Sequence, residues 1–380
     1  ARPIVLGEFW RRVSGKGSLL ADKEELSGWL RPGQVAVGVK AGCEVIVHSL
    51  RQWFERNQDN SRYILLKKDF SNAFNEAEPD AFLNTACRRT PGSARLAEWC
   101  YGEESHLIYN GEVFSSGAGV HKSSRGQQGC PLMMPLFCAM KREMRDAIPE
   151  VGGLDYAADF ADDGGDEGDF EEVYKVLEKE IALGPQYGLR NNYDKMVVYP
   201  LAGRAFTGDL SKFERLGIKI DYSQNVKFMQ VPVVGSGEFV REWVEYKMGV
   251  TKQVFAGLRG LSKRQVALYL LRRAGHGCRV LYYLRTTPRD LIPQFVQCFD
   301  EEMRGALEDI LGLVLDDAQW EQASLPTRSS GLGLCRASDV ADIAYIASRH
   351  TTFGDCRALD ARHVWDDGTV RGDGTPDVNG

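Results

Sequence analysis

The tetrapeptide Phe160-Ala161-Asp162-Asp163 decides how this chain is interpreted, because it places two carboxylates side by side. A third carboxylate, Asp69, stands much earlier in the chain. Paired carboxylates supply the hard oxygen ligands that two Mg²⁺ ions need in a phosphoryl-transfer site. Taken alone, an Asp-Asp pair before Gly164-Gly165 is also typical of a solvated acidic turn, so its meaning depends on the neighbouring segments.

Strands are predicted around both acidic motifs. Residues 63–70 form a short apolar run bounded by polar residues, which predicts a buried strand that presents Asp69 at its end. Residues 155–168 are expected to form a hairpin that carries Asp162 and Asp163. If the two segments lie side by side, acidic side chains from distant parts of the chain meet at one point.

A glycine-rich segment lies between the acidic motifs, from Arg125 to Leu132, with the sequence Arg-Gly-Gln-Gln-Gly-Cys-Pro-Leu. Its glycines let the backbone approach a nucleotide closely, and Gln128 can form hydrogen bonds. A helix is predicted from Pro131 to about Ala147, since proline is favoured in a first helical turn. The alternative is an ordinary glycine turn that opens a helix.

Together, the segments at 68–74, 125–132 and 160–163 resemble, in this order, motifs A, B and C of reverse transcriptases, with the nearest likeness to the non-LTR (LINE-type) retrotransposon group. The resemblance implies an α+β chain with the right-hand polymerase fold: incomplete fingers, an antiparallel-sheet palm and a helical thumb. It also implies an RNA-directed DNA polymerase. Such an enzyme uses an RNA template, a primer strand, deoxynucleoside triphosphates and two Mg²⁺ (or Mn²⁺) ions.

The resemblance further implies roles for single residues. Asp69 and Asp162 would hold the metal ions, with Asp163 as the neighbouring carboxylate of the same catalytic and metal site. Lys195, in a segment that resembles the fourth motif, would lie near the pyrophosphate and act as a general acid. Phe74 would lie beneath the sugar and disfavour a 2′-hydroxyl. The substrate-binding residues implied in this way are Phe70, Phe74, Gln128, Gly129 and Arg2.

The remaining patterns suit this organisation. Helices are predicted within residues 7–57 and from about 170 to 183, a hairpin at Asn110-Gly111, short strands at 195–199, 217–220 and 226–233, and helices from 238 to about 348. By resemblance, Phe228-Met229-Gln230 occupies the place of the primer-grip turn. The domains expected are a fingers remnant (1–60), a palm with inserted fingers elements (61–236), a helical thumb-like region (237–350) and a flexible tail (351–380).

Composition limits the function classes. The formal net charge of −6 counts against strong nucleic-acid binding, although basic residues gather near both ends of the chain. No uncharged apolar run is long enough for a membrane span, and the start shows no secretory signal. Nine scattered cysteines without a Cys-x-x-Cys pair argue against zinc and disulfides and favour a reducing intracellular compartment, the nucleus for a working retroelement product. A start without methionine suggests a processed or incomplete chain.

One feature departs from the family. Acidic residues crowd the predicted hairpin, at Asp155, Asp159, Asp162, Asp163, Asp166, Glu167 and Asp169, where the family has apolar strand residues. Either the segment binds metal avidly or the hairpin has frayed, and we expect it to be more exposed than in an active polymerase. Two other functions therefore stay open. One is a catalytically inactive structural subunit recruited into a larger protein or ribonucleoprotein assembly, and the other is RNA binding without catalysis.

Overall fold

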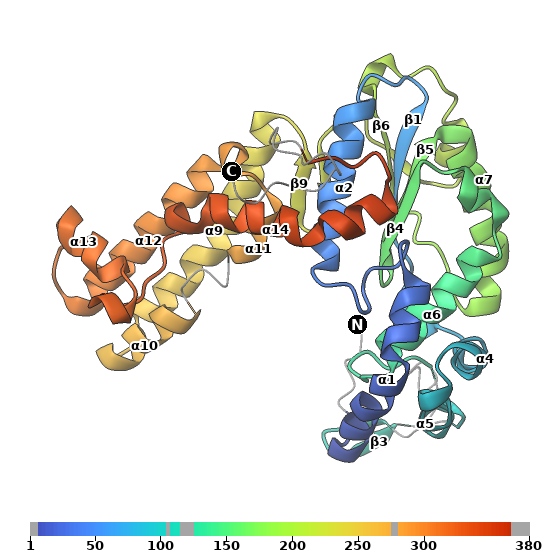
Figure 1. Cartoon of the computed structure of the whole chain (residues 1–380), viewed down its shortest axis with the longest axis horizontal. Helices are drawn as coiled ribbons and strands as arrows, with labels where there is room; N and C mark the ends of the chain where they lie inside the picture. The colour runs from blue at the N-terminus through green and yellow to red at the C-terminus, as the bar shows by residue number, and fades with distance from the viewer. Residues whose placement is uncertain (1–6, 104–106, 115–124, 275–279, 366–380) are drawn as a thin grey trace. The chain divides into compact units, whose positions relative to one another are not determined.

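The computed structural model describes residues 7–103, 107–114, 125–274 and 280–365 (Figure 1). The chain divides into two compact units. Unit 1 comprises Ala1–Gln224 and Gly354–Val364, and unit 2 comprises Asn225–Phe353 and Trp365–Gly380. Among the described residues, no helix combines the length and the apolar character needed to cross a membrane.

Unit 1 mixes helices with a small, mostly antiparallel sheet. Its helices are α1 (Phe9–Leu30), α2 (Gly42–Asn57), α3 (Ala73–Glu76), α4 (Pro79–Arg89), α5 (Pro91–Tyr101), α6 (Met133–Asp146), η1 (Pro149–Gly153), α7 (Phe170–Leu183), η2 (Gly184–Tyr187), η3 (Gly203–Ala205) and α8 (Ser211–Arg215). Its strands are β1 (Tyr63–Lys68), β2 (Leu107–Tyr109), β3 (Glu112–Phe114), β4 (Tyr156–Phe160), β5 (Asp163–Asp169), β6 (Val197–Pro200) and β7 (Lys219–Ile220). The strands predicted at 63–70 and 195–199 and the hairpins at 110–111 and 155–168 are confirmed, with small shifts in their ends.

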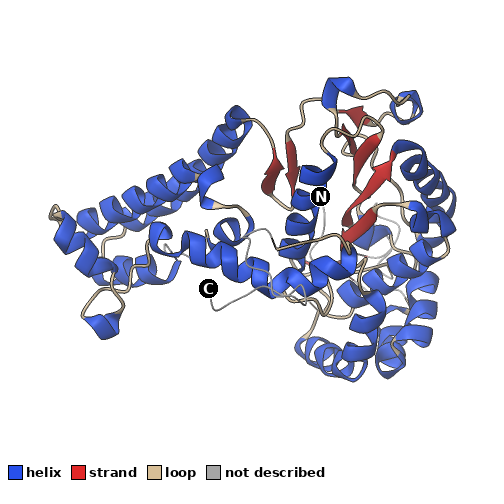
Figure 2. Cartoon of the chain, turned by 45° about the horizontal axis from the view of Figure 1, so that its top comes forward, coloured by secondary structure: helices blue, strands red, loops and turns tan. Residues whose placement is uncertain are grey.

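Five strands form the main sheet, in the order β4-β5-β1-β6-β7. Figure 2 shows the strands in red among the helices. β1 is central and pairs antiparallel with both β5 and β6. β4 and β5 are the two arms of the predicted acidic hairpin, and they pair antiparallel across the turn at residues 161–162. Because β1 lies next to β5, the end of β1 and the hairpin turn lie at the same edge of the sheet.

Helix α7 covers one face of this sheet, in contact with β1 and β5 (Figure 1). The helix predicted from about 170 to 183 is confirmed, and its Phe170, Val173 and Leu177 are buried in one core cluster with Ile64 and Leu66 of β1. Asp169 begins the helix, and its side chain accepts a hydrogen bond from the backbone N–H of Glu171. This is an N-cap, which satisfies a donor that the first helical turn leaves unpaired.

Helix α2 packs on β4, and residues 354–364 return to α2 from the far end of the chain. The Gln52 side chain donates to the carbonyl of Val364 (2.6 Å) and accepts from its N–H (3.0 Å). Asp155 accepts hydrogen bonds from Trp53 Nε1 (3.0 Å), from the Tyr63 hydroxyl (3.3 Å) and from Arg362 (3.0 Å). Residues 351–365 therefore differ from the flexible tail that the sequence predicted, since these long-range contacts are not visible in a local pattern. Residues 366–380 lie outside the described residues.

A helical layer adjoins the sheet of unit 1. Helices α4, α5 and α6 share one apolar core, in which Phe82, Tyr101, Leu136 and Phe137 are fully or almost fully buried. α1 packs on α5 and α6. The break between α1 and α2 includes Pro32-Gly33.

Unit 2 is mostly helical, as predicted. It contains the hairpin β8 (Val226–Phe228) and β9 (Val231–Val234), followed by α9 (Gly237–Arg259), α10 (Arg264–Ala274), α11 (Leu281–Thr286), η5 (Arg289–Leu291), α12 (Pro293–Leu311), α13 (Asp317–Ser324), η6 (Thr327–Ser329) and α14 (Ala337–Leu359), whose last turns belong to unit 1. The segment 226–233 was predicted as one strand. It is a hairpin instead, because Met229 and Gln230 both adopt positive φ and reverse the chain.

Candidate functional site

The strand register brings Asp69 and Asp163 together. Lys68 pairs with Gly164 across β1 and β5, so the next residues outward along the two antiparallel strands are Asp69 and Asp163. Asp162 precedes Asp163 in the hairpin turn. The three carboxylates that the sequence singled out therefore lie at one edge of the sheet.

Electrostatic coupling between these carboxylates is visible at Asp163. Partial desolvation by neighbouring atoms raises the pKa of Asp163, and the negative charges of Asp162 and Asp69 raise it further. Lys141 and Lys67 act in the opposite direction. Carboxylates that repel one another at a sheet edge form a place where a divalent cation lowers the energy.

The carboxylate of Asp69 is held by residues of the segment that follows η2. Asn192 donates from its side-chain Nδ2 to Asp69 Oδ2 (2.8 Å), and the Lys195 ammonium lies 3.8 Å from the same oxygen. The backbone N–H of Asn192 donates to the carbonyl of Asp69 (2.9 Å). Lys195 is largely exposed, so its ammonium remains accessible beside the site.

The donor set suits Mg²⁺, because all three side chains offer hard carboxylate oxygens. Within the described parts of the chain, however, no three His, Cys, Asp or Glu side chains converge in an arrangement that can hold a metal ion. One Asp69 oxygen is already engaged by Asn192. The backbone therefore brings Asp69, Asp162 and Asp163 to the same end of the sheet, but their carboxylate groups do not converge on a point where a metal ion could bind.

The turn that carries Asp162 is fixed from two sides. Ala161 adopts a left-handed conformation (φ 57°), which is uncommon for a residue with a side chain. The Gln34 side chain accepts from the N–H of Ala161 (2.9 Å) and donates to its carbonyl (3.3 Å). From α6, the Lys141 ammonium donates to the carbonyls of Ala161 (3.0 Å) and Asp162 (3.2 Å).

The glycine-rich loop is attached to α3, which follows Asp69. Asn75 donates from its side chain to the carbonyl of Gly126 (3.2 Å), and Arg125 binds the Glu76 carboxylate (3.0 Å). Gly126 lies so close to the carbonyl of Phe74 that a side chain there would clash with it. The predicted motifs A and B are thus packed directly against each other.

The substrate-binding residues predicted around this loop have different surroundings. Gln128 is half-buried, and Gly129 is exposed with φ 107°. Phe74 is half-buried against Phe137 of α6, with ring centroids 4.5 Å apart, whereas Phe70 is buried. Arg2 lies outside the described residues. The roles of these residues in substrate binding stay predictions.

The predicted exposure of the acidic hairpin is wrong. Asp159, Asp166 and Glu167 are 4%, 0% and 1% exposed. The charges of Asp159 and Asp166 are met inside unit 1 by three cations, Lys68 of β1 and Lys141 and Arg145 of α6, with Glu180 of α7 as a further anion.

The ion pairs form one connected network. The Lys68 ammonium lies 3.0 Å from both Asp166 and Glu180. Arg145 binds Asp166 (2.7 Å) and also Glu180, and Lys141 binds Asp159 (2.9 Å). Burying a carboxylate is costly unless it is paired and hydrogen-bonded, which explains why the hairpin tolerates acids at inward positions. Gly164, opposite Asp159, leaves room for that carboxylate over the strand.

Glu167 is the exception in this network. It lies on the other face of β5, cross-strand from Tyr156, and one of its carboxyl oxygens has no hydrogen-bond partner in the described structure. Desolvation, together with the negative charge of Asp166, holds the pKa of Glu167 well above its usual range. The hairpin therefore contains buried carboxylates that are paired with cations, such as Asp166, and one carboxylate, Glu167, whose surroundings favour the protonated form.

The sequence reasoning missed Lys141 and Arg145 and did not give Gln34 its part in holding the turn. A usable signal was present, because Lys141 and Arg145 stand four residues apart on the same side of α6 as Phe137, Met140 and Met144. Two cations on an apolar helix face, next to a strand rich in acids, indicate buried ion pairs.

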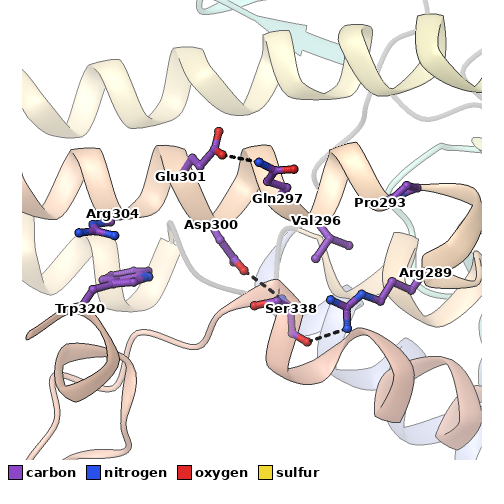
Figure 3. Close-up of a pocket in the computed structure, with 9 residues that line it drawn as sticks. All are labelled: Arg289, Pro293, Val296, Gln297, Asp300, Glu301, Arg304, Trp320 and Ser338. Carbon is purple, nitrogen blue, oxygen red and sulfur yellow. Dashed lines mark hydrogen bonds between the residues drawn. The ribbon is translucent and has the colours of Figure 1, made fainter. Parts of the chain in front are cut away.

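One surface hollow belongs to unit 2. A cavity of about 440 Å³ in unit 2 is lined by α12 residues, including Asp300 and Arg304, and by Trp320 and Ser338 (Figure 3). It contains none of the predicted catalytic residues. In this cavity Asp300 accepts from the backbone N–H groups of Ala337 (2.6 Å) and Ser338 (3.1 Å), which is a structural cap for α14.

Comparisons with known proteins give structural neighbours but no family. No protein-family model matches the sequence, and the curated proteins give no match. Among solved structures, the chain is similar to telomerase from Candida albicans in complex with a fragment of telomeric RNA (TM-score 0.45, 11% identity) and to apo telomerase from Candida tropicalis (TM-score 0.41, 10% identity). The alignments cover 92% and 88% of this chain and 55% and 60% of the telomerase chains. Likeness at these scores does not define a function.

Proposed function

We propose that this chain is a reverse-transcriptase-like protein that carries out template-directed DNA synthesis by nucleotidyl transfer. The observation that carries the proposal is the strand register, which places Asp69 beside the turn of Asp162 and Asp163. The resemblance of three ordered sequence motifs supports it. In this proposal the five-stranded sheet is the palm, and the helices of unit 2 are thumb-like.

The residues have distinct parts in the proposed reaction. The 3′-hydroxyl oxygen of a primer bonds to the α-phosphorus of a deoxynucleoside triphosphate, the bond from that phosphorus to the bridging oxygen breaks, and pyrophosphate leaves. Two Mg²⁺ ions, when bound, lower the pKa of the hydroxyl and neutralise the leaving group. Asp69, Asp162 and Asp163 would hold the ions. The hydroxyl proton passes to solvent, and Lys195, exposed beside Asp69, can donate a proton to pyrophosphate.

A primer-extension assay tests this proposal. The protein is incubated with primed RNA, deoxynucleotides and Mg²⁺ or Mn²⁺. We expect extension that Asp162→Asn reduces at least about a thousandfold, because the metal ions supply several kcal/mol of transition-state stabilisation. The matched control is Asp169→Asn, an acid of the same hairpin that pairs with Arg62 at the surface. No extension, or extension that survives Asp162→Asn, rejects the proposal.

A second candidate function is an inactive structural subunit derived from a reverse transcriptase. Asp69 favours it, because its carboxylate is bound by Asn192 and Lys195 and does not converge with Asp162 and Asp163. This candidate predicts no extension and a stable complex with protein or ribonucleoprotein partners in native extracts. A monomeric protein without partners in those extracts argues against it.

A further inference from the structure

We propose that Lys141 is the positioning residue of the candidate catalytic site, a role that rests on the proposed function. It lies on α6 and is completely buried. Its ammonium binds backbone carbonyls of the turn that carries Asp162 and Asp163, and it lies near the ring of Phe70, which follows Asp69.

The ammonium of Lys141 makes two hydrogen bonds and one ion pair. It donates to the carbonyls of Ala161 (3.0 Å) and Asp162 (3.2 Å), and it pairs with the Asp159 carboxylate (2.9 Å). Two of its three donors are thus bound to the turn, and its charge is balanced by Asp159. The side chain is thereby fixed, and with it the backbone of the turn.

The same ammonium reaches the other half of the site. It lies 5.0 Å from the centre of the Phe70 ring, within the range of a cation–π interaction. Phe70 directly follows Asp69. Lys141 therefore contacts residues on both sides of the site, Phe70 at the end of β1 and the β4–β5 turn that carries Asp162 and Asp163.

The turn needs such a partner because its conformation is not locally favoured. Ala161 is left-handed, and a non-glycine residue in that region persists only where the surroundings fix it. Gln34 fixes Ala161 alone, whereas Lys141 also binds the carbonyl of Asp162 itself. Loss of Lys141 is expected to free the carboxylate-bearing residue while the bonds to Gln34 remain.

The test separates positioning from charge balance. Lys141→Met leaves Asp159 without its closest cation and so lowers stability, whereas Lys141→Met with Asp159→Asn removes one charge of each sign. The matched control is Lys68→Met. Lys68 is also a fully buried lysine of the network, and it pairs with Asp166 and Glu180. Stability is followed by urea unfolding. The turn is followed by hydrogen exchange of the amides at 160–163 relative to those of β6, and the site by Mn²⁺ affinity.

We expect the double variant to recover most of the stability lost in Lys141→Met. It should still show turn exchange about tenfold faster than wild type and Mn²⁺ affinity at least about tenfold weaker, the range typical when a group that orients a metal ligand is lost. Lys68→Met should leave the relative exchange of the turn unchanged. A double variant with wild-type turn exchange overturns the proposal. If the wild-type protein binds no Mn²⁺, the proposed function fails, and the exchange data still decide whether Lys141 holds the turn.

Discussion

The ammonium of Lys68 lies 3.0 Å from a carboxylate oxygen of Asp166, and neither side chain is exposed to solvent. This pair lies one residue inward from Asp69 on β1 and three residues inward from Asp163 on β5. Buried ion pairs therefore lie next to the end of the sheet that carries the candidate catalytic residues.

Removal of Asp166 should strongly destabilise unit 1. Burial opposes its ionisation, but the charges of Arg145 and Lys68 prevail and lower the pKa of Asp166 to about 2. Asp166→Asn leaves those cations uncompensated, so we expect a loss of about 3–5 kcal/mol in the free energy of unfolding. Urea denaturation measures this. The control Asp169→Asn affects an exposed pair and should change stability by less than about 1 kcal/mol.

Acid should remove the contribution of Asp166 in a defined window. Its pKa is lower in the folded state than the unfolded value of about 3.9, so its stabilisation is present above about pH 4. The contribution is lost as the pH falls through about 2. The Asp166→Asn variant should therefore show a shallower fall in stability across this window than the wild-type protein. Equal slopes for the two proteins would contradict the buried pair.

Glu167→Gln should stabilise the protein at neutral pH. The pKa of Glu167 is raised in the folded state, so its contribution is most favourable below the unfolded pKa of about 4.3 and declines as the pH rises. Glutamine keeps the shape without a charge. We expect a gain of about 1 kcal/mol or more at pH 7 and little difference at pH 4, measured by thermal unfolding at both pH values. A destabilised variant at pH 7 would show that the ionised carboxylate is required.

Truncation after Phe353 should destabilise unit 1, although the cut removes only the end of the chain. It deletes Val364, Arg362 and Asp360, which bind Gln52, Asp155 and Arg56, respectively. Truncation after Trp365 keeps these contacts and is the control. Limited proteolysis should cleave unit 1 of the shorter protein faster than that of the control. Equal cleavage would mean that residues 354–364 are dispensable.

Asp300→Ala should destabilise unit 2 by about 1–2 kcal/mol, since it leaves two N–H groups at the start of α14 without their acceptor. The neighbouring Glu301→Ala is the control, because Glu301 accepts only from Gln297 at the surface. The control should change stability by less than about 0.5 kcal/mol. Urea unfolding followed by circular dichroism distinguishes the two variants.

Several parts of the fold were predictable from local pattern. The apolar run of β1, the Asn-Gly turn and the spacing of Phe170, Val173 and Leu177 each fix an element through its own residues. The turn at Met229-Gln230 was indicated only by the resemblance to a primer-grip turn and not by local pattern, because neither residue type favours positive φ.

The sequence predicted the carboxylates of the candidate site but not the residues that hold them in place. Asp69, Asp162 and Asp163 were found because their motifs are contiguous in sequence. Lys141 acts through groups on a different element, and the burial of Asp166 depends on cations from β1 and α6. Whether an acid is exposed or paired inside is decided by packing between elements, which a single sequence does not specify.

The return of residues 354–364 to unit 1 has a consequence for synthesis of the chain. Unit 2 is inserted between two portions of unit 1, so a ribosome has released almost all of unit 2 before the last portion of its host emerges. Domains that form during translation usually mature from the N-terminus onward. In this chain, unit 1 is completed only after almost all of unit 2 has been synthesised. The surface of α2 therefore stays uncovered until residues 354–364 have left the ribosome.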